Sequence, residues 1–582
     1  MLLKYRGVAS DRRIAGRKGA AFGAVAFGFS AVVFGFICVL PAQAQVLPGA
    51  VTPGRIRPGP EVPQQPDFDF SIVAPQRSPI PRAVDEVHFK LADIKIVGAV
   101  TIAAAEFRPL YTGLIGKEIT LRDILDIADK IEAAYRGRGY LLVRAYVPPQ
   151  RVRDGVFTID VVEGHLANVT VQGGDDDVRA RVQNYLAPAM AERPLTLPAM
   201  ERGLLMANDI PGVTASGVLK PSPDTPGASD LVVDVVQPWI TGGLTVDNRG
   251  SRFSGIWTVA GDAEINSIFG EDQLVGTVTF SPSSFEEVEG SLRYRRAIGD
   301  DGLVGSVFGV ITHGEPGSTL SAANVLTDSW AAGPRLTYPV IRTRDETLLL
   351  DGGLTVQDAR ISILGTGISH DQWRVFDIGG TYARNNILGG GSWTTTFDVA
   401  QGLPILGATA NHSPQASRAG ALFDFTKITA FSRLAVPLFD RFSTVLSAQG
   451  QYSFAPLITG EQVTYGGTLI GRGYDPGAIT GDSGVGGSAE LRYDIRLAND
   501  YVKALEPYAY VEAAQTWYIQ RGPAKSPSLT DQHIVSVGGG LRFWLPYNIT
   551  AALEGARTLE AVPGSDAGRE ATKLLVDLAV RF

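Results

Sequence analysis

One arginine of this sequence, Arg472, lies between two glycines, Gly471 and Gly473, and the aromatic residue Tyr474 follows. Glycine lets the backbone turn sharply and take positive φ, and the turn-forming run Asp-Pro-Gly occupies 475–477. The stretch therefore offers a guanidinium carried on a tightly turned loop. What that guanidinium meets depends on the element that the loop joins.

The loop leads into a segment in which apolar and polar residues alternate. A glycine-rich run at 481–487 comes first. The apolar positions are then Ala489, Leu491, Tyr493, Ile495 and Leu497, and between them lie Ser488, Glu490, Arg492, Asp494 and Arg496. One such strand fits a soluble sheet with one wet face. Repeated along the chain, it favours a transmembrane barrel with lipid outside and water inside.

A string inside the glycine-rich run could suggest catalysis. Gly-Asp-Ser-Gly at 481–484 is similar to the nucleophile loop of chymotrypsin-like serine proteases, whose chemistry needs a histidine base and a buried acid that converge on the serine. The six histidines, at 88, 165, 313, 370, 412 and 533, are scattered and have no matching motif. No phosphate-binding loop precedes a helix, and no metal-ligand spacing is present. We predict no enzyme, no catalytic residues, no cofactor and no metal.

The first 44 residues predict a secretory signal peptide. Residues 4–18 are rich in lysine and arginine, residues 20–40 are apolar, and a small-residue cleavage site ends at Ala44. The alternative is an uncleaved membrane anchor, because the apolar run could almost span a bilayer. The only cysteine, Cys38, lies in that run, so the mature chain is predicted to have neither disulfides nor a thiol nucleophile.

Residues 45–86 are predicted to be a linker. Nine prolines occur between positions 48 and 81, and proline disfavours helix and sheet alike. We interpret this segment as a disordered spacer.

Composition narrows the class of protein. The 582 residues leave room for several domains, and 45% of them are hydrophobic, yet no apolar stretch after the signal is long enough for a membrane helix. The 67 glycines suit many short strands and turns. A net charge of −8 argues against a nucleic-acid partner. A secretory signal, together with many predicted strands and no predicted membrane helix in the mature chain, points to the bacterial outer membrane.

Two small α+β modules are predicted after the linker, at 87–166 and 167–238, each with the order β-α-α-β-β. In the first we expect a strand at 89–97, helices at 107–114 and from the cap Thr120 to 137–139, and strands at 140–147 and 156–162. In the second we expect strands at 169–171, 216–219 and 231–236, with helices near 178–186 and 198–208. An internal repeat of one module explains this pattern. Such a module can bind an extended chain by strand addition; the alternative is a mere periplasmic spacer.

Residues 239–582 are predicted to form a transmembrane β-barrel with a long loop at 453–485. We expect strands at 240–247, 254–266, 273–281, 285–297, 303–314, 327–338, 346–359, 371–383, 391–401, 420–435, 441–452, 486–499, 505–519, 532–544, 548–559 and 572–582. That is about sixteen, an even number as in single-chain outer-membrane barrels. The last strand ends in Phe582, with alternate apolar residues on the lipid side.

Together these features resemble the two-partner secretion translocators, the hemolysin or adhesin secretion/activation proteins of the Omp85 superfamily. The modules look like the POTRA domains of that family. The resemblance also rests on Val-Asp-Asn-Arg-Gly at 246–250, the Gly-Arg-Gly-Tyr stretch and the terminal Phe582. It covers about 87–582. It implies a mainly β fold, an outer-membrane barrel of about sixteen strands preceded by two POTRA-like domains.

The resemblance implies a role for the arginine loop. In the family the loop folds back into the barrel, and its arginine pairs with an acidic residue on a nearby strand wall. Here Glu512 occupies the place of that acidic residue, and it shares one strand face with Tyr508 and Tyr510. Arg472, Gly473, Tyr474 and Glu512 are therefore the predicted translocation residues. The alternative is that Arg472 only solvates a loop tip.

The sequence departs from the family pattern at two places. The family usually has a β-branched residue before the arginine, where this chain has Gly471. Its members often place an N-terminal helix inside the barrel, and residues 45–86 show no helical pattern.

The resemblance implies export of an unfolded exoprotein, hemolysin- or adhesin-like, that is bound in the periplasm and passed through the barrel. The expected location is the outer membrane, with the modules in the periplasm, so the expected partners are the exoprotein and outer-membrane lipid. The alternative function is a POTRA-bearing factor that assembles or inserts other outer-membrane proteins. A passive porin would leave the modules unexplained.

Overall fold

The computed structural model describes residues 70–72, 87–152, 154–225, 227–282, 286–520, 529–562 and 571–582. The predicted signal peptide, and the linker apart from Phe70–Ile72, lie outside the described residues. Cleavage after Ala44 therefore stays a prediction.

The first module contains a three-stranded sheet and a separate strand pair. The sheet has the order β3 (Asp93–Val97), β6 (Val156–Glu163), β5 (Val143–Tyr146), in which β3 runs parallel and β5 antiparallel to β6. The separate pair is β2 (His88–Lys90) with β4 (Glu118–Thr120). This arrangement gives the small sheet two edge strands, β3 and β5.

The helix α1 (Leu121–Gly137) covers this module's core, and its cap is the predicted one. The side chain of Thr120 accepts a hydrogen bond from the backbone N of Asp123, and the Asp123 carboxylate accepts one from the backbone N of Thr120. This capping box satisfies amides that lack partners within the first turn. The apolar face of α1 is buried, and its residues are Ile124, Ile127, Ala128, Ile131 and Tyr135.

Two predicted elements of the first module differ in the structure. The single strand expected at 89–97 is two strands, because Leu91 between them turns aside to hydrogen-bond with residues 116 and 117. The helix expected at 107–114 is instead two 3₁₀ turns, η3 (Ala104–Leu110) and η4 (Thr112–Leu114). Pro109 lies inside η3, and its missing N–H cannot donate in an α-helical ladder.

The second module has the predicted order β-α-α-β-β. Its elements are β7 (His165–Gly173), α2 (Asp176–Ala191), α3 (Leu197–Asn208), β8 (Thr214–Pro221) and β9 (Ala228–Val236). The helices bury residues such as Val182, Leu186 and Leu204 against the sheet. None of the described helices is long and apolar enough to cross a membrane.

The linker contributes a strand that the sequence analysis did not predict. β1 (Phe70–Ile72) pairs in parallel with β8, from Phe70–Gly217 to Ile72–Leu219, so the second sheet has the order β1-β8-β9-β7. The prediction of a structureless spacer was therefore wrong at these residues. No proline lies between Pro66 and Pro75, so the segment keeps the amides that a ladder needs.

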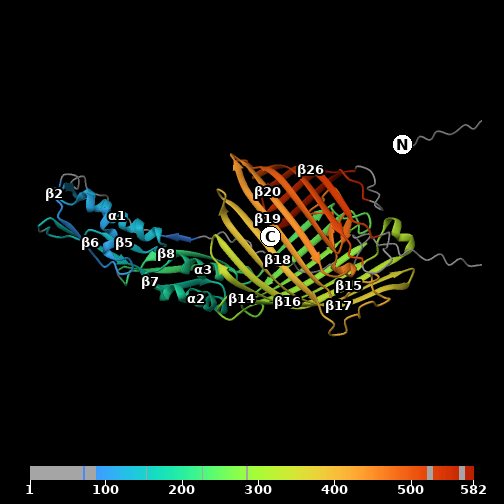
Figure 1. Cartoon of the computed structure of the whole chain (residues 1–582). Coiled ribbons are helices and arrows are strands. Elements are labelled where there is room, and N and C mark those ends of the chain that lie inside the picture. The colour runs from blue at the N-terminus through green and yellow to red at the C-terminus, as the bar shows by residue number, and fades with distance from the viewer. Residues whose placement is uncertain are drawn as a thin grey trace, which may run out of the picture. The chain divides into compact units, whose positions relative to one another are not determined.

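A closed antiparallel barrel follows, in which each strand pairs with the next (Figure 1). Its strands are β10 (Ile240–Asp247), β11 (Thr258–Asn266), β12 (Asp272–Phe280), β13 (Glu287–Ile298), β14 (Leu303–Gly314), β15 (Val325–Arg342), β16 (Glu346–Ile363), β17 (Thr366–Ile387), β18 (Gly391–Gly402), β19 (Thr426–Phe439), β20 (Phe442–Ser453), β23 (Ser483–Tyr493), β24 (Ile495–Arg496), β25 (Ala504–Trp517), β26 (Gln532–Leu545), β27 (Ile549–Thr558) and β28 (Thr572–Arg581). β23 and β24 both pair with β25 and form one strand interrupted at Asp494. The barrel therefore has sixteen strands, and this prediction is confirmed.

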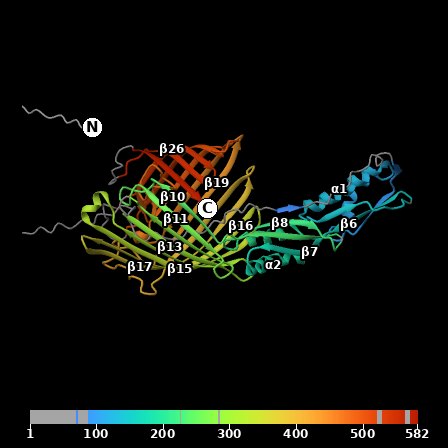
Figure 2. The same ribbon diagram turned by 180° about the vertical axis from the view of Figure 1, so that it is seen from behind.

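The barrel closes between its first and last strands, β10 and β28, which pair from Gly243–Arg581 to Asp247–Asp577 (Figure 2). At the end of the barrel where the chain enters and leaves, connections such as 388–390 and 546–548 are short. At the other end lie the long connections 403–425 and 454–482. Short turns are typical of the periplasmic side and long loops of the extracellular side.

The two faces of the barrel differ as the alternation predicts. Leu574 and Leu578 on β28, and Phe582 directly after it, are exposed toward the lipid side, with exposed fractions of 65%, 47% and 77%. On the inner face of β25 and β26, Glu512 and Ser536 are almost fully buried. The lumen is therefore filled by protein at this height, and the segment that fills it is the long loop.

Candidate functional site

The long loop between β20 and β23 is folded rather than extended. It contains the 3₁₀ turn η6 (Thr459–Glu461) and the strands β21 (Val463–Tyr465) and β22 (Ile479–Gly481). The two strands pair antiparallel, from Val463–Gly481 to Tyr465–Ile479. Residues 466–478 at the tip of this hairpin carry the arginine.

Glycines tighten the tip of the hairpin. Gly466, Gly467 and Gly471 have φ of 107°, 93° and 93°, which L side chains rarely adopt. The amide of Gly466 donates to the carbonyl of Ile470 at 3.0 Å. A Cβ added at Gly471 would lie 2.6 Å from Cδ1 of Ile534. The departure from the family pattern at position 471 therefore has a structural reason, because a β-branched residue there would be both strained and crowded.

An apolar cluster holds the loop against the inner wall. It joins residues of the loop to residues of β25 and β26 and to Val562, and its members are Val463, Tyr465, Ile470, Tyr474, Ile479, Ala514, Ile534 and Val562. Arg472 lies beside this cluster and is only 8% exposed. The alternative in which Arg472 solvates a loop tip is therefore wrong.

Arg472 meets Glu512 with both its side chain and its backbone. Nε of Arg472 donates to Oε1 of Glu512 at 2.7 Å, and the backbone N of Arg472 donates to Oε2 at 2.8 Å. The amide of Gly471 donates to the same Oε2 at 2.7 Å, and Ser536 Oγ does so at 3.2 Å. One carboxylate thus binds the turn of the loop and its guanidinium together, and such charge-assisted bonds are stronger than neutral ones.

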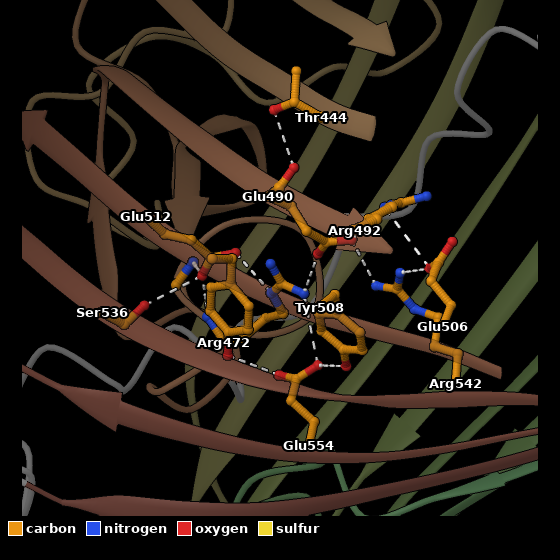
Figure 3. Close-up of polar contacts among 12 residues, drawn as sticks. Thr444, Arg472, Glu490, Arg492, Glu506, Tyr508, Glu512, Ser536, Arg542 and Glu554 are labelled. Atoms are coloured by element: carbon orange, nitrogen blue, oxygen red, sulfur yellow. Dashed lines mark hydrogen bonds and ion pairs between the residues drawn. The ribbon is translucent and has the colours of Figure 1, made fainter. Parts of the chain in front are cut away.

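Two more carboxylates share the guanidinium (Figure 3). Nη1 of Arg472 lies 2.9 Å from Oε2 of Glu490 on β23 and 3.6 Å from Oε2 of Glu554 on β27. Its central carbon also lies 3.3 Å from the centroid of the Tyr510 ring, a cation–π contact. Glu554 in turn accepts hydrogen bonds from the hydroxyls of Tyr508 and Tyr510, at 2.7 and 2.8 Å.

Further arginines complete the charge balance. Arg542 bridges Glu490 and Glu506 at 2.9 and 2.6 Å, and Arg492 Nε donates to Glu490 at 2.7 Å. Arg249, on the loop after β10, lies 3.4 Å from Glu554. Buried charges are tolerated when they are paired and hydrogen-bonded. We call the set around Arg472 the loop network; its members are Arg249, Arg472, Glu490, Arg492, Glu506, Tyr508, Tyr510, Glu512, Arg542 and Glu554.

The other two predicted residues fix the loop to β26 and β27. The Tyr474 hydroxyl is within 2.8 Å of the carbonyl oxygens of Val535 and Glu560. A Cβ added at Gly473 would lie 3.1 Å from Cβ of Ser536 and 3.2 Å from Cγ2 of Thr558. Glycine therefore lets the loop backbone approach the wall closely at this point.

The structure brings all four predicted residues, Arg472, Gly473, Tyr474 and Glu512, to one place on the inner wall. The sequence analysis missed Glu490 and Glu554 as partners of the arginine. Glu490 was assigned to the polar face of its strand, but only the register shows that it pairs with Tyr510. Among the described residues, no group of three or more His, Cys, Asp or Glu side chains is placed to hold a metal ion.

Comparison with known families decides the identity. The family model of the haemolysin secretion/activation protein ShlB/FhaC/HecB matches residues 227–543, more than half of the chain, and the ShlB-type POTRA domain model matches residues 89–164. The chain belongs to this family. It is an outer-membrane transporter of two-partner secretion exoproteins, with N-terminal POTRA domains, and not an enzyme.

Individual relatives agree with this assignment. The outer membrane transporter CdiB of Escherichia coli is 24% identical over 68% of this chain and 67% of its own length. The heme/hemopexin transporter protein HuxB of Haemophilus influenzae is 22% identical over 79% of this chain and 81% of its own length.

Solved structures share the fold. The structure of CdiB from Escherichia coli has a TM-score of 0.64 at 20% identity and covers 88% of this chain and 93% of its own. BamA from Haemophilus ducreyi, lacking POTRA domains 1–3, has a TM-score of 0.53 at 13% identity and covers 85% of this chain and all of its own. The likeness to BamA extends to the fold alone. The alternative of a factor that inserts other outer-membrane proteins therefore gains nothing from it, and the family match assigns export.

Proposed function

We propose that the POTRA-like modules bind the unfolded exoprotein by strand addition and that the exoprotein then crosses the membrane through the barrel lumen. Folding outside the cell supplies a driving force. The exoprotein is hemolysin- or adhesin-like. The observation that carries the proposal is the loop network, because a loop drawn into the lumen by buried ion pairs is a device for keeping a protein-sized path closed at rest.

The sheet edges of the modules support strand addition. β5 is an edge strand of the first sheet, and β7 is an edge strand of the second. At the opposite edge of the second sheet, β8 accepts the short segment β1 in parallel register. The ring of Phe70 packs against the core of this module. An extended segment with alternating apolar residues is therefore the kind of ligand that such an edge binds.

Arg472, Gly473, Tyr474 and Glu512 are proposed to hold the loop in its resting place. Their contacts join the loop to three neighbouring strands, β25, β26 and β27. An extended polypeptide that passes this height needs the space that the loop occupies. Export then requires the loop to move, and the network sets how readily it moves.

Deletion of residues 87–164 tests the role of the modules. The transporter is co-expressed with its exoprotein, which is sought first in the adjacent gene, and the exoprotein is measured in the medium. We expect export to be abolished while the barrel remains inserted, because strand addition needs the module and burial in lipid does not. Heat-modifiable migration of the barrel is the control for insertion. Undiminished exoprotein in the medium would show that the first module does not bind it.

A further inference from the structure

Asp482 joins three extracellular loops at the point where the arginine loop enters β23. It belongs to the Gly-Asp-Ser-Gly string, which has no catalytic role, and it is fully buried. Oδ1 accepts a hydrogen bond from the backbone N of Leu457 at 2.9 Å, and Oδ2 accepts one from the backbone N of Ile519 at 2.7 Å. The neighbouring Ser483 Oγ accepts from the amide of Ser453 at 3.0 Å. The string therefore anchors the bases of two loops, the arginine loop 454–482 and the connection between β25 and β26.

The third loop supplies a cation. Arg418 lies on the connection 403–425 between β18 and β19, and its Nη1 donates to Oδ1 of Asp482. The same guanidinium donates to the carbonyl of Leu457 at 3.1 Å and to that of Ile519 at 3.0 Å. The central carbon lies 5.1 Å from the centroid of the Tyr518 ring. One planar fork thus satisfies acceptors at both ends of the loop 454–482 and one on the connection after β25, a task for which arginine suits better than lysine.

The loops around this pair form a small folded core of their own. Its apolar residues come from β16–β18 and from the loops 403–425 and 454–482, and they are Ala359, Trp373, Val375, Ala400, Ala421, Phe423, Phe425, Ala455, Leu457 and Ile458. The Trp373 indole N donates to Oε1 of Glu461 at 2.7 Å, and Lys427 pairs with Oε2 at 2.9 Å. The amide of Leu422 donates to the carbonyl of Pro456 at 2.9 Å. The connection 403–425 is therefore packed against the arginine loop.

This arrangement is separate from the loop network. Asp482 lies at the base of the loop 454–482, whereas Arg472 lies in its tip, and none of the polar contacts described for Arg418 or Asp482 involves a member of the loop network. A single anchor at the tip would leave the base of so long a loop free to swing. Two separate anchors restrict both.

We propose that Arg418 and Asp482 form a second lock, which positions the base of the arginine loop and keeps the connection 403–425 packed over the extracellular mouth. The second lock opens during export, together with the loop network. This inference rests on the proposed passage of the exoprotein through the lumen. It makes Arg418 and Asp482 positioning residues for the loop.

A first experiment examines the resting state. Arg418→Ala, Asp482→Asn and the double variant are compared at equal amounts of heat-modifiable barrel, and the uptake of vancomycin by whole cells is measured. We expect each single variant to raise uptake severalfold and the double variant to be no worse than either, because each change breaks the same contact. Arg360→Ala, which removes an exposed arginine next to Asp358 on β16, is the matched control and should leave uptake unchanged.

A second experiment replaces the lock by a removable tether. The double variant Arg418→Cys/Asp482→Cys is joined by a short bifunctional thiol reagent that contains a disulfide; the predicted mature chain has no cysteine of its own. We expect the tethered protein to export little exoprotein and the same cells to recover export when a reductant is added. Export by the reduced form shows that the proposed function holds, so the tether tests the second lock alone. Equal export in the tethered and reduced states, or unchanged vancomycin uptake in the single variants, would overturn the inference.

Discussion

At the scale of single residues, Arg472 is bound more firmly than a surface ion pair allows. Exposed pairs contribute about 0 to 1 kcal/mol, because water and salt screen them and the side chains lose entropy. Arg472 is 8% exposed and faces Glu512, Glu490 and Glu554 together with the ring of Tyr510. Losing one partner of a buried pair costs on the order of a few kcal/mol, and less where the lumen is wet. Arg472→Lys should restore little of the secretion that Arg472→Ala loses, since an ammonium cannot reproduce the two-pronged contacts of the guanidinium.

The positive φ of Gly471 leads to a prediction about its substitution. The variant Gly471→Val restores the β-branched residue typical of the family, but it places that residue at φ 93° and against Ile534. Strain of this kind costs roughly 1–3 kcal/mol. We expect the loop to be cleaved faster by external protease in intact cells, with the barrel level unchanged.

The control for this variant is Gly389→Val, since Gly389 has a similar φ of 86° but open space around it, at a periplasmic turn. It should leave cleavage of the loop unchanged. Equal protection of the loop from protease in Gly471→Val and the wild type would show that the turn does not need glycine at position 471.

At the scale of elements, the register in which the barrel strands pair determines which side chains meet in the loop network. Glu490 on β23 pairs with Tyr510 on β25, and Tyr510 pairs with Gly538 on β26. A Cβ on Gly538 would lie 2.3 Å from the Tyr510 hydroxyl oxygen. The absence of a side chain at Gly538 therefore lets the tyrosine lie across β26 and reach Glu554 on β27. The glycines of β26 are part of the site although they carry no functional group.

The seam between β10 and β28 is extended by a side chain. The ladder of paired residues ends at Asp247–Asp577, and Asn248 continues it. Its Nδ2 donates to the carbonyl of Leu574 at 2.9 Å, and its Oδ1 accepts from the amide of Val576 at 2.7 Å. The next residue, Arg249, reaches Glu554 of the loop network.

Asn248→Ala should weaken the seam. It removes two hydrogen bonds, worth about 1 kcal/mol each. We expect the barrel to lose its heat-modifiable form at a lower temperature than the wild type. Asn168→Ala, which removes an amide hydrogen bond to Asp230 in the second module, is the control and should leave that temperature unchanged. If the two variants melted alike, the clamp at Asn248 would contribute nothing to closure.

At the scale of the whole molecule, much of the fold could be predicted from the sequence. Apolar and polar residues alternate along membrane strands because one face contacts lipid and the other contacts water. Even short strands can therefore be recognised in the sequence. The sixteen strands and the α1 cap at Thr120 follow from local pattern, whereas the position of Glu512 opposite the arginine was implied by the resemblance to the family. The 3₁₀ turns around Pro109 replaced a predicted helix because proline outweighed the apolar periodicity there.

The contacts that could not be predicted join segments far apart in the chain. Glu554 meets Arg472, and Asp482 meets Arg418, only because several strands pair in one register and loops fold between them. The alternation of residues within one strand carries no information about such long-range contacts. The strand at Phe70–Ile72 was missed for the same reason, since its partner β8 lies more than a hundred residues away.

The central claim is that the loop is held in the lumen by the pair of Arg472 and Glu512 and that this hold governs export. A double-mutant cycle measures it most directly. Exoprotein in the medium is compared for Arg472→Ala, Glu512→Ala and the double variant at equal barrel levels. Arg335→Ala serves as the control for loss of a partly buried, ion-paired arginine of the barrel, because Arg335 pairs with Asp351 and Asp377 rather than with the loop.

Both single changes should lower secretion, because a loop that has lost its inward anchor samples other positions and no longer returns to one defined resting place. The double variant should be no worse than the more damaging single one, because the second change removes a group that is already unpaired. Purely additive defects on a logarithmic scale would show that the two residues do not act together and would contradict the account.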